Sequence, residues 1–343
     1  MSPRPNNTWA GGWDAQGPPG GQRILPLPGV WRPACPIIPA CALDRHDHVI
    51  RVTSPWRARD FDEIHNHLDY LAFPFSRLTP TPMITTAHGR LDLPEVRRVY
   101  DEFREQRLVS VSHDQASRLP NANWIANVYS AINLTNFHFR SKPGDYLIFL
   151  GRIHPEKRPD RAIEIAHAAG LRIVIAAKVA TVDEKYYRAV IKPLIEASPP
   201  VEFVGEVDEA AKDELLGGAY AYLFPIDWPE PFGLTMIEAM ATGTPVIATR
   251  SGSVPELIAD GVTGFVCDSS AEMVRAVERV REIDRAKCRQ HVEDNFSPAA
   301  MASAYETVYR SVVAAKPGVP ADDRTPLTPV GSPRRDRPFG EPR

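Results

Sequence analysis

Two glutamates eight positions apart stand out in the stretch 228-WPEPFGLTMIEAMATGTPVIA-248. The loop Trp228–Pro231 holds two prolines and is predicted to be rigid and non-helical. Good helix formers follow up to Gly243, a plausible cap, so Glu230 lies in the loop and Glu238 lies one turn inside a helix. In an open α/β sheet such a loop lies at the carboxyl ends of the strands, which is the usual ligand crevice.

The start of this predicted helix has the features of an anion site. Its free N–H groups would belong to Phe232, Gly233 and Leu234, and N–H groups at a helix start bind anions well. Carboxylates beside an anion accept hydrogen bonds from hydroxyl groups instead. A ligand with phosphates in the middle and hydroxyl-rich parts at both ends would therefore fit Glu230, Glu238 and the helix start. A nucleotide sugar has this composition.

A second group of residues agrees with this interpretation. In 150-LGRIHPEKRPDRAI-163 a predicted strand ends at Gly151, and Arg152 and Lys157 follow it. Two cations in a strand-to-helix loop can neutralise a diphosphate leaving group. Either cation alone could equally be a solvated surface charge. Their combination with the glutamate pair favours a role in binding.

The two patterns, G-R-x4-K and E-x7-E, resemble those of the retaining glycosyltransferases of the family-4 type, which have the two-domain GT-B fold. The spacing E-x7-E alone is weak, but here it is embedded in P-E-P-F-G-L-x-x-I-E-A-M-A-x-G-T-P-V-I-A, which is very specific. The resemblance runs from about Asp60 to about Ala315 and is densest over 146–268.

The resemblance implies a role for each matching residue. Arg152 and Lys157 would hold the donor diphosphate, and Glu238 would bind the ribose hydroxyls. Glu230 and the amides of residues 232–234 would lie at the transferred sugar and the phosphates. Gly151 would also contribute to donor binding, and the loop Gly205-Glu206-Val207 would border the nucleotide base.

Three histidines lie near predicted strand ends in the amino-terminal part. The stretch 85-TTAHGR-90 resembles the family's strand-end histidine, so His88 is expected to contact the donor sugar or the reacting centre. A purely structural role is the alternative for a lone histidine. His65 and His67 could suggest a metal site, but no third ligand at a ligand-like spacing is evident. We therefore expect a strand end at the cleft there.

The resemblance also implies a mechanism. The acceptor would attack on the face from which the nucleoside diphosphate leaves, and the leaving phosphate would take the acceptor's proton. The expected catalytic residues are His88, Glu230, Arg152 and Lys157. We expect no metal, because the chemistry of this fold does not require one, and no tightly bound cofactor, because the nucleotide-diphosphate sugar acts as the donor substrate. The acceptor, a sugar, a lipid or another small molecule, stays open.

Composition limits the other classes of function. The chain has 343 residues and a net charge of −3, which gives no general attraction to nucleic acid or to an anionic membrane. Its four cysteines show no zinc-type spacing, which suits a reducing compartment. We expect no transmembrane segment and no signal peptide. Cytoplasm is the default location, and peripheral membrane contact stays open.

Short β-rich runs alternate with helical stretches from residue 60 onward. This alternation predicts an α/β fold with parallel strands and βαβ crossovers, in two Rossmann-like domains that face a cleft. The runs are 61-FDEIHNH, 82-PMITTAH, 108-LVSVSH, 124-WIANVY, 146-YLIFLG, 171-LRIVIAA, 201-VEFVGEV, 219-AYAYLFP, 245-PVIATR and 264-GFVCD.

The expected organisation has five parts. Residues 1–59 form an atypical segment rich in Pro, Trp and Gly that is expected to be poorly ordered. Residues 60–143 are the remnant of an acceptor-side domain, and 144–298 form the nucleotide-sugar domain, with a hinge near Ser141–Gly144. A last helix spans 299–315, with an apolar face that must dock elsewhere, and residues 316–343 form a disordered tail.

The amino-terminal part departs from the family pattern. The family opens with a β-strand and a glycine-rich loop that faces the donor phosphates, and neither is legible in residues 1–59. Ala131 and Asn133 stand where the family usually has Gly and Asp. We therefore expect an incomplete acceptor-side domain and poor transfer. A frameshift upstream of codon 60 is one hypothesis, and sequencing of the locus tests it.

Two further classes of function stay open. One is another GT-B activity, such as a nucleotide-sugar epimerase or a phosphorylase, although no lysine signature for pyridoxal phosphate is visible. The other is a nucleotide-sugar binder without activity. Turnover of the donor without an acceptor would favour the first, and binding without transfer would favour the second.

Overall fold

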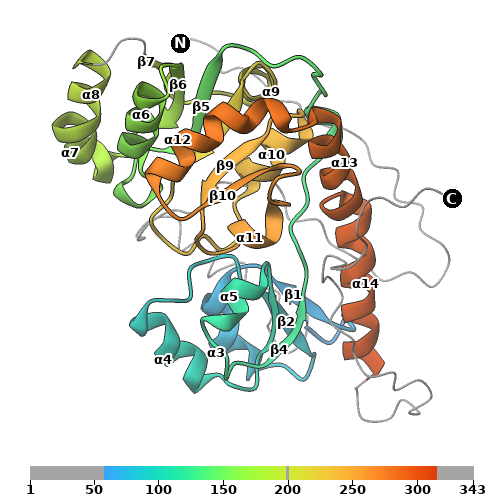
Figure 1. The fold of residues 1–343 in the computed structure, drawn as a ribbon. Coiled ribbons are helices and arrows are strands. Elements are labelled where there is room, and N and C mark those ends of the chain that lie inside the picture. Colours follow the sequence, from blue (N-terminus) through green and yellow to red (C-terminus); the bar gives the residue numbers. More distant parts are fainter. Residues whose placement is uncertain (1–57, 198–200, 315–343) are drawn as a thin grey trace, which may run out of the picture.

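The computed structural model describes residues 58–197 and 201–314, which form two α/β lobes (Figure 1). The expectations for the segment before residue 58 and for the tail after residue 314 lie outside the described residues. All strand pairs in both lobes are parallel. The predicted α/β fold with two parallel sheets is therefore confirmed.

The smaller, amino-terminal lobe is built on a sheet with the strand order β1-β2-β3-β4. Its strands are β1 (Ile64–Asn66), β2 (Met83–Thr86), β3 (Arg107–Ser110) and β4 (Trp124–Asn127). Each strand overlaps one of the predicted runs, and β3 begins one residue before its run. The helices of this part are η1 (Asp69–Ala72), α3 (Phe73–Ser76), α4 (Pro94–Glu102), α5 (His113–Ser117) and η2 (Leu134–Asn136).

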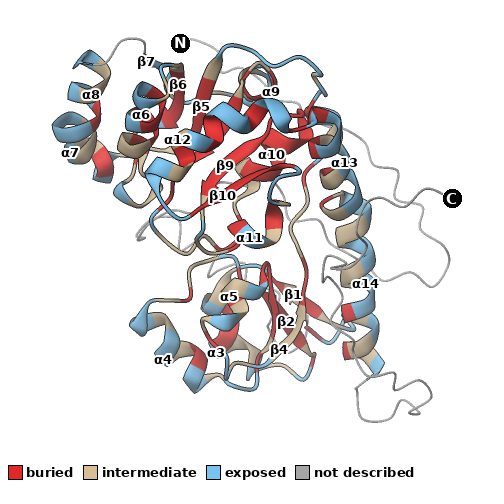
Figure 2. Cartoon of the chain, in the orientation of Figure 1, coloured by how far each residue is buried: buried red, intermediate tan, exposed pale blue. Residues whose placement is uncertain are grey.

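The larger lobe is built on a sheet with the strand order β10-β9-β8-β5-β6-β7. Its strands are β5 (Tyr146–Arg152), β6 (Arg172–Lys178), β7 (Val201–Phe203), β8 (Ala221–Phe224), β9 (Val246–Thr249) and β10 (Gly264–Cys267). The strands at the centre of this sheet are buried along most of their length, as their apolar sequences predict for strands covered on both faces (Figure 2).

Helices cover both faces of the larger sheet. They are η3 (Pro155–Lys157), α6 (Pro159–Ala168), η4 (Thr181–Asp183), α7 (Glu184–Tyr186), η5 (Tyr187–Ile191), α8 (Lys192–Ala197), α9 (Glu209–Gly217), α10 (Leu234–Ala241), α11 (Val254–Leu257), α12 (Ser270–Arg279), η6 (Val280–Glu282) and α13 (Arg285–Asn295). No helix among the described residues is both long enough and apolar enough to cross a membrane.

The strand order reverses between β5 and β8, because the chain builds outward from β5 through β6 to β7 and then returns to add β8, β9 and β10. Such a reversal separates the loops that follow the two central strands and leaves a crevice at their carboxyl ends. Arg152 is the last residue of β5, Lys157 follows it in η3, and the loop after β8 carries Glu230. The topology therefore brings the two predicted groups of residues to one edge of the sheet.

Helix α10 begins later than the sequence indicated. Gly233 has a φ of 87° and precedes the helix, which begins at Leu234. This left-handed conformation cannot continue into a helical turn. Of the three residues predicted at the helix start, Phe232 and Gly233 therefore lie before the helix and Leu234 belongs to its first turn. At the other end, Gly243 follows α10 with a φ of 91° and takes the predicted capping role.

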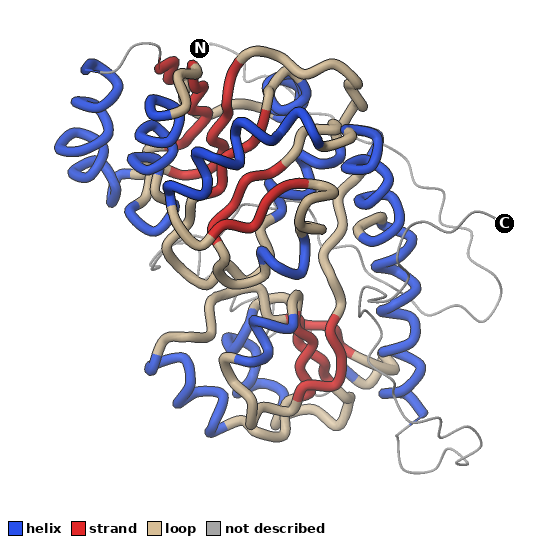
Figure 3. Tube along the Cα trace, in the orientation of Figure 1, coloured by secondary structure: helices blue, strands red, loops and turns tan. Residues whose placement is uncertain are grey.

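The last helix, α14 (Pro298–Ala314), returns to the amino-terminal lobe (Figure 3). Its buried residues Val308 and Val312 pack with Ile84, Val109 and Val128 of the smaller lobe. The predicted apolar face thus docks on the other lobe. Two segments cross between the lobes side by side, and the N–H of Ile132 on one donates to the carbonyl of Phe296 on the other, at 3.3 Å.

Candidate active site

The loop after β5 places two cations at the carboxyl edge of the larger sheet. Arg152 ends the strand, and its Nε lies 3.3 Å from a carboxylate oxygen of buried Asp183 in η4, which follows the neighbouring strand β6. Lys157 ends η3, and its Nζ forms an ion pair with Glu230. The same Nζ lies 4.8 Å from the centre of the Trp228 ring. Both expected diphosphate ligands are therefore held by carboxylates.

Glu230 is fixed through its backbone as well as its side chain. Its carbonyl accepts a hydrogen bond from the N–H of Ser253 at 3.0 Å, and the hydroxyl of Ser253 donates to the carbonyl of Phe232 at 2.5 Å. Gly252 packs so closely on this loop that a Cβ there would lie 2.4 Å from the backbone nitrogen of Glu230. Gly252 and Ser253, which precede α11, therefore fix the backbone of the loop that carries Glu230.

Glu238 lies on α10 and is 8% exposed. Its Oε1 accepts from the Nζ of Lys212 on α9 at 2.7 Å, while its buried Oε2 has no hydrogen-bond partner among the described residues. Burial raises the pKa of the Glu238 carboxyl, and the charge of Lys212 acts in the opposite direction. An unpartnered buried carboxylate oxygen is costly without a donor, and a ligand hydroxyl would supply one.

Tyr222 connects the two halves of this site. It lies on β8 and is fully buried, and its hydroxyl donates to the carbonyl of Leu150 at 3.1 Å. The same hydroxyl lies 2.8 Å from the hydroxyl of Thr235 at the start of α10. The end of β5, just before Gly151, is thereby held against the first turn of the helix that carries Glu238.

The side chain of Phe232 points away from the site. It is buried and lies 6.1 Å from Tyr129 and 6.0 Å from Phe296, ring centre to ring centre. Tyr129 and Phe296 lie on the two segments that cross between the lobes. The predicted role of the Phe232 amide in donor binding stays a prediction, whereas its ring packs where the lobes join.

His88 follows β2 and pairs with His67, which follows β1. The Nε2 of His88 lies 2.9 Å from the Nδ1 of His67, and the rings are stacked with their centres 5.2 Å apart. The backbone N–H of His88 donates to the Asp69 carboxylate at 2.8 Å. The two histidines thus lie together at the carboxyl ends of adjacent parallel strands, as expected for a strand end that faces the other lobe.

His65 has a different environment from His67 and His88. Its Nδ1 lies 2.7 Å from the hydroxyl of Tyr309, and its Nε2 lies 2.8 Å from the hydroxyl of Thr86. Burial, together with the charges of the two neighbouring histidines, lowers the pKa of His65 to about 2. Within residues 58–197 and 201–314, no group of three or more His, Cys, Asp or Glu side chains could hold a metal ion.

The lobes meet directly beside the predicted donor site. Arg90, two residues after His88, forms an ion pair with Glu156 in the loop after β5. The guanidinium carbon of Arg90 also lies 5.3 Å from the centre of the Trp228 ring. The hydroxyl of Ser112 donates to the carbonyl of Pro231 at 2.6 Å. The strand end that carries His88 is therefore tied to the loops that carry Lys157 and Glu230.

Val207 is half-buried and packs against the core of the larger lobe, in the loop between β7 and α9. No described contact joins it to the other predicted site residues, so its place beside a nucleotide base stays a prediction. The loop leads directly into α9, which carries Lys212.

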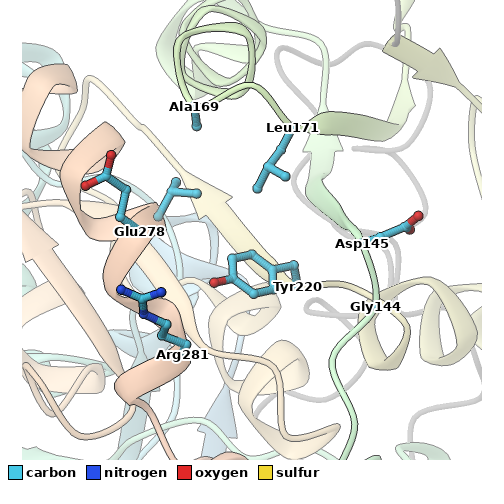
Figure 4. A pocket seen from close by; sticks show the side chains of 8 residues that line it. Gly144, Asp145, Ala169, Leu171, Tyr220, Glu278 and Arg281 are labelled. Carbon is cyan, nitrogen blue, oxygen red and sulfur yellow. The ribbon is translucent and has the colours of Figure 1, made fainter.

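A separate cavity of about 560 Å³ lies at the opposite edge of the larger sheet, where the strands begin. Tyr220 lies between Asp145 on one side and Glu278 and Arg281 on the other (Figure 4). None of the predicted site residues lines it. Ligand chemistry in a parallel sheet is expected at the carboxyl ends of the strands, so we place the candidate site at that edge and not in this cavity.

Four residues of the site were not singled out from the sequence: Lys212, Asp183, Tyr222 and Arg90. Each acts through a neighbour that is distant in the sequence, such as Glu238 for Lys212 and Arg152 for Asp183. For Asp183 and Arg90 the sequence offered one signal, which is that they follow the predicted strands β6 and β2 and so lie at the same sheet edge as the predicted residues. Nothing local marks Lys212 or Tyr222.

Two lobes of parallel sheet, with a polar site at the strand reversal of the larger one, define the class of open α/β proteins whose ligand crevice lies at a switch point. Residues 134–295 match the family model described as glycosyl transferases group 1. The predicted resemblance to this family is therefore confirmed for this part of the chain.

Solved structures show the same fold. HepE from Anabaena in complex with UDP superimposes with a TM-score of 0.67 at 16% identity, over 77% of this chain and 82% of that one. Sucrose-phosphate synthase from Thermosynechococcus elongatus gives a TM-score of 0.65 at 20% identity, over 82% and 81%. The GT-B fold is therefore confirmed.

The matches to curated relatives cover a smaller share of each relative's length. N-acetyl-alpha-D-glucosaminyl L-malate synthase of Bacillus anthracis is 34% identical over 122 residues, 33% of this chain and 31% of the relative. Phosphatidyl-myo-inositol mannosyltransferase of Mycobacterium leprae is 28% identical over 252 residues, 63% and 65%. The chain thus spans between about a third and two thirds of these relatives.

Proposed function

We propose that this protein is a retaining glycosyltransferase that moves a sugar from a nucleotide-diphosphate sugar to an acceptor. The observation that carries the proposal is the buried Glu238 carboxylate, whose Oε2 has no partner among the described residues. It lies on the helix after β8, and of the two cations Arg152 ends the adjacent strand β5 and Lys157 follows it. A ribose hydroxyl on Glu238 and a diphosphate on the cations would satisfy these groups together.

In the proposed reaction the bond between the sugar carbon and the donor phosphate breaks as the acceptor oxygen bonds to the same face of the sugar. The leaving phosphate takes the acceptor's proton. Arg152, Lys157 and the amides before and within the first turn of α10 would stabilise the developing negative charge. Each such contact is expected to contribute about 3–4 kcal/mol to the transition state. His88 and Glu230 would contact the transferred sugar.

Several features support the remaining parts of the proposal. The structural neighbour in complex with UDP supports a nucleotide-diphosphate donor. The larger lobe, proposed to begin near residue 144, would bind this donor, and the smaller lobe would present the acceptor. Cys267 and Cys288 are free and buried, which supports a reducing, cytoplasmic compartment. Impaired transfer, predicted from the atypical residues 1–59, stays a prediction.

Nucleotide binding tests the proposal with two variants. UDP, GDP and ADP are screened by thermal shift, since a ligand that binds the folded state raises the melting temperature. We expect Glu238→Ala to weaken the best nucleotide at least about tenfold, as for a lost charged hydrogen bond. Glu230→Ala should spare nucleotide binding, because it removes only the counter-ion of Lys157 and leaves the cation in place for the diphosphate. The same variant should weaken binding or transfer of the sugar.

The exposed Glu278 supplies the control, because Glu278→Ala removes a carboxylate far from the site. Equal losses of nucleotide affinity in the Glu230 and Glu238 variants would contradict the proposed division of roles. Donor turnover to a free sugar epimer without acceptor would favour an epimerase instead. Nucleotide binding without transfer to any acceptor would favour a binding protein.

A further inference from the structure

The pair formed by Lys212 and Glu238 is buried at the predicted ribose end of the site. Lys212 comes from α9 and Glu238 from α10, and their ion pair spans 2.7 Å from Nζ to Oε1. The side chains of Lys212 and Glu238 are 22% and 11% exposed. The pair therefore joins two helices whose positions the larger sheet already determines.

The two oxygens of Glu238 differ in what they contact. Oε1 accepts from Lys212, whereas Oε2 is buried without a hydrogen-bond partner among the described residues. A carboxylate can accept on both oxygens, so the pair with Lys212 uses one oxygen and leaves the other for a ligand. The side chain of Lys212 also fixes the rotation of the carboxylate, because Oε1 must face α9.

We propose that Lys212 is a positioning residue for the nucleotide: it keeps Glu238 ionised and turned so that Oε2 accepts a hydrogen bond from a ribose hydroxyl. This inference rests on the proposed function, because it assumes that the ligand of Glu238 is a nucleoside diphosphate. Lys212 itself would not touch the ligand. Its effect would appear as recognition of the ribose and not as a general attraction to phosphate.

The charges around Glu238 agree with this role. On α9, Lys212 favours the ionised form and Glu209 opposes it. From β8, burial raises the pKa of Tyr222, whose hydroxyl is also close enough to Glu230 and Glu238 that their charges raise it further. From α13, Arg289 donates to the carbonyls of Ala241 and Phe137 and pairs with Glu293.

Lys212 forms its ion pair with Glu238 among the described residues. Burial favours the neutral form of Glu238. Without Lys212, this carboxyl would therefore ionise only at a higher pH.

The experiment measures the dissociation constant of the best nucleoside diphosphate from the thermal-shift panel, together with its 2′-deoxy and 3′-deoxy analogues, between pH 6 and 9. The wild-type protein should prefer the ribonucleotide over at least one analogue throughout. Lys212→Met should weaken ribonucleotide binding about tenfold at pH 7, equivalent to about one lost hydrogen bond to a charged group. The preference over that analogue should shrink at the same pH.

The pH dependence separates positioning from a merely structural role. In Lys212→Met, affinity and ribose preference should recover as the pH rises, because Glu238 then ionises without Lys212. Lys212→Arg should restore much of both at pH 7, since a guanidinium also donates to a carboxylate. Lys287→Met, on the exposed side of α13, is the matched control and should bind as the wild type does.

Two outcomes would overturn the inference while leaving nucleotide binding intact. One is a Lys212→Met protein with unchanged affinity and preference. The other is a protein whose affinity falls equally for ribose and deoxyribose ligands at every pH. Failure of the wild-type protein to bind any nucleoside diphosphate would instead contradict the proposed function, and the inference with it.

Discussion

At the scale of single residues, the charged groups of the candidate site are paired before any ligand arrives. Arg152 lies against Asp183, Lys157 against Glu230 and Lys212 against Glu238. Such pairs hold long side chains in place, which lowers the entropy lost when a ligand binds. The site is therefore organised in advance of the ligand.

The low pKa of His65 predicts that the stability of the protein depends on pH. Its pKa is about 2 in the folded protein, against an ordinary value of 6.5. Below pH 6.5 the unfolded chain therefore binds a proton that the folded protein does not. The free energy of unfolding should therefore decrease as the pH decreases, and His65 should account for at most about 1.4 kcal/mol of this decrease per pH unit. Urea titrations at pH 7, 6 and 5 measure the slope.

The variant His65→Gln cannot take up this proton and keeps a polar side chain beside Thr86 and Tyr309. Its stability should be lower at pH 7 and should depend less on pH between 7 and 5. His167→Gln changes an exposed histidine on α6 and should leave the slope as in the wild type. A His65→Gln protein with the full wild-type slope would contradict the prediction.

At the scale of elements, one carboxylate of the larger lobe closes the start of a helix in the smaller one. Glu256 on α11 accepts from the N–H groups of His113 and Asp114 at 2.8 and 2.7 Å, where α5 begins. It also accepts from the hydroxyl of Tyr129 at 3.1 Å. The first N–H groups of a helix have no partner within it, so α5 depends on the opposite lobe for those of His113 and Asp114, whereas Ser112 of its own lobe accepts from the N–H of Gln115.

Glu256→Ala should therefore loosen the contact between the lobes. We expect faster amide exchange at His113 and Asp114, by about tenfold or more, because each loses a charged acceptor worth about 1.5–3 kcal/mol. Small-angle scattering should show a larger radius of gyration if the lobes separate. Glu278→Ala, in which an exposed carboxylate is removed, should change neither. Unaltered exchange at both amides in Glu256→Ala would rule out this role.

At the scale of the whole molecule, the lobes differ in how their cores are completed. The larger lobe has one continuous core, whereas the smaller lobe has three separate clusters among the described residues. One of the three depends on α14, at the end of the described chain. Tyr305 and Tyr309 of α14 also reach Thr86 and His65 at the strand ends. The smaller lobe is thus held together by residues far away in sequence.

A charge in this contact should affect the two lobes unequally. Val308→Asp would bury a carboxylate against Ile84, Val109 and Val128 and should destabilise the smaller lobe by about 2–4 kcal/mol. Hydrogen exchange should increase in β1 to β4 and stay unchanged in β5, β6 and β8. Nucleotide affinity should be retained.

Thr307→Asp, at the adjacent exposed position of α14, is the control and should have little effect. Equal loss of protection in both sheets would show that the lobes unfold as one unit. That outcome would contradict the independence predicted here.

Local patterns in the sequence were sufficient to locate the ten described strands and the parallel α/β architecture, and they predict the two groups of site residues. Strand periodicity, turn residues and the pattern around Glu230 and Glu238 act over a few residues, so they can be read without the fold. The start of α10 was misplaced because the conformation of Gly233 depends on the loop that Ser253 and Gly252 hold from another strand.

The tertiary structure alone decided the partners of the site residues. Asp183 contacts Arg152 across 31 positions of sequence because parallel strands bring their carboxyl ends together, and Lys212 contacts Glu238 across 26 positions because α9 packs against α10. In the same way, only the fold placed α14 on the smaller lobe and Phe232 where the lobes join. These contacts depend on the strand order and on helix packing, and no local spacing in the chain encodes either one.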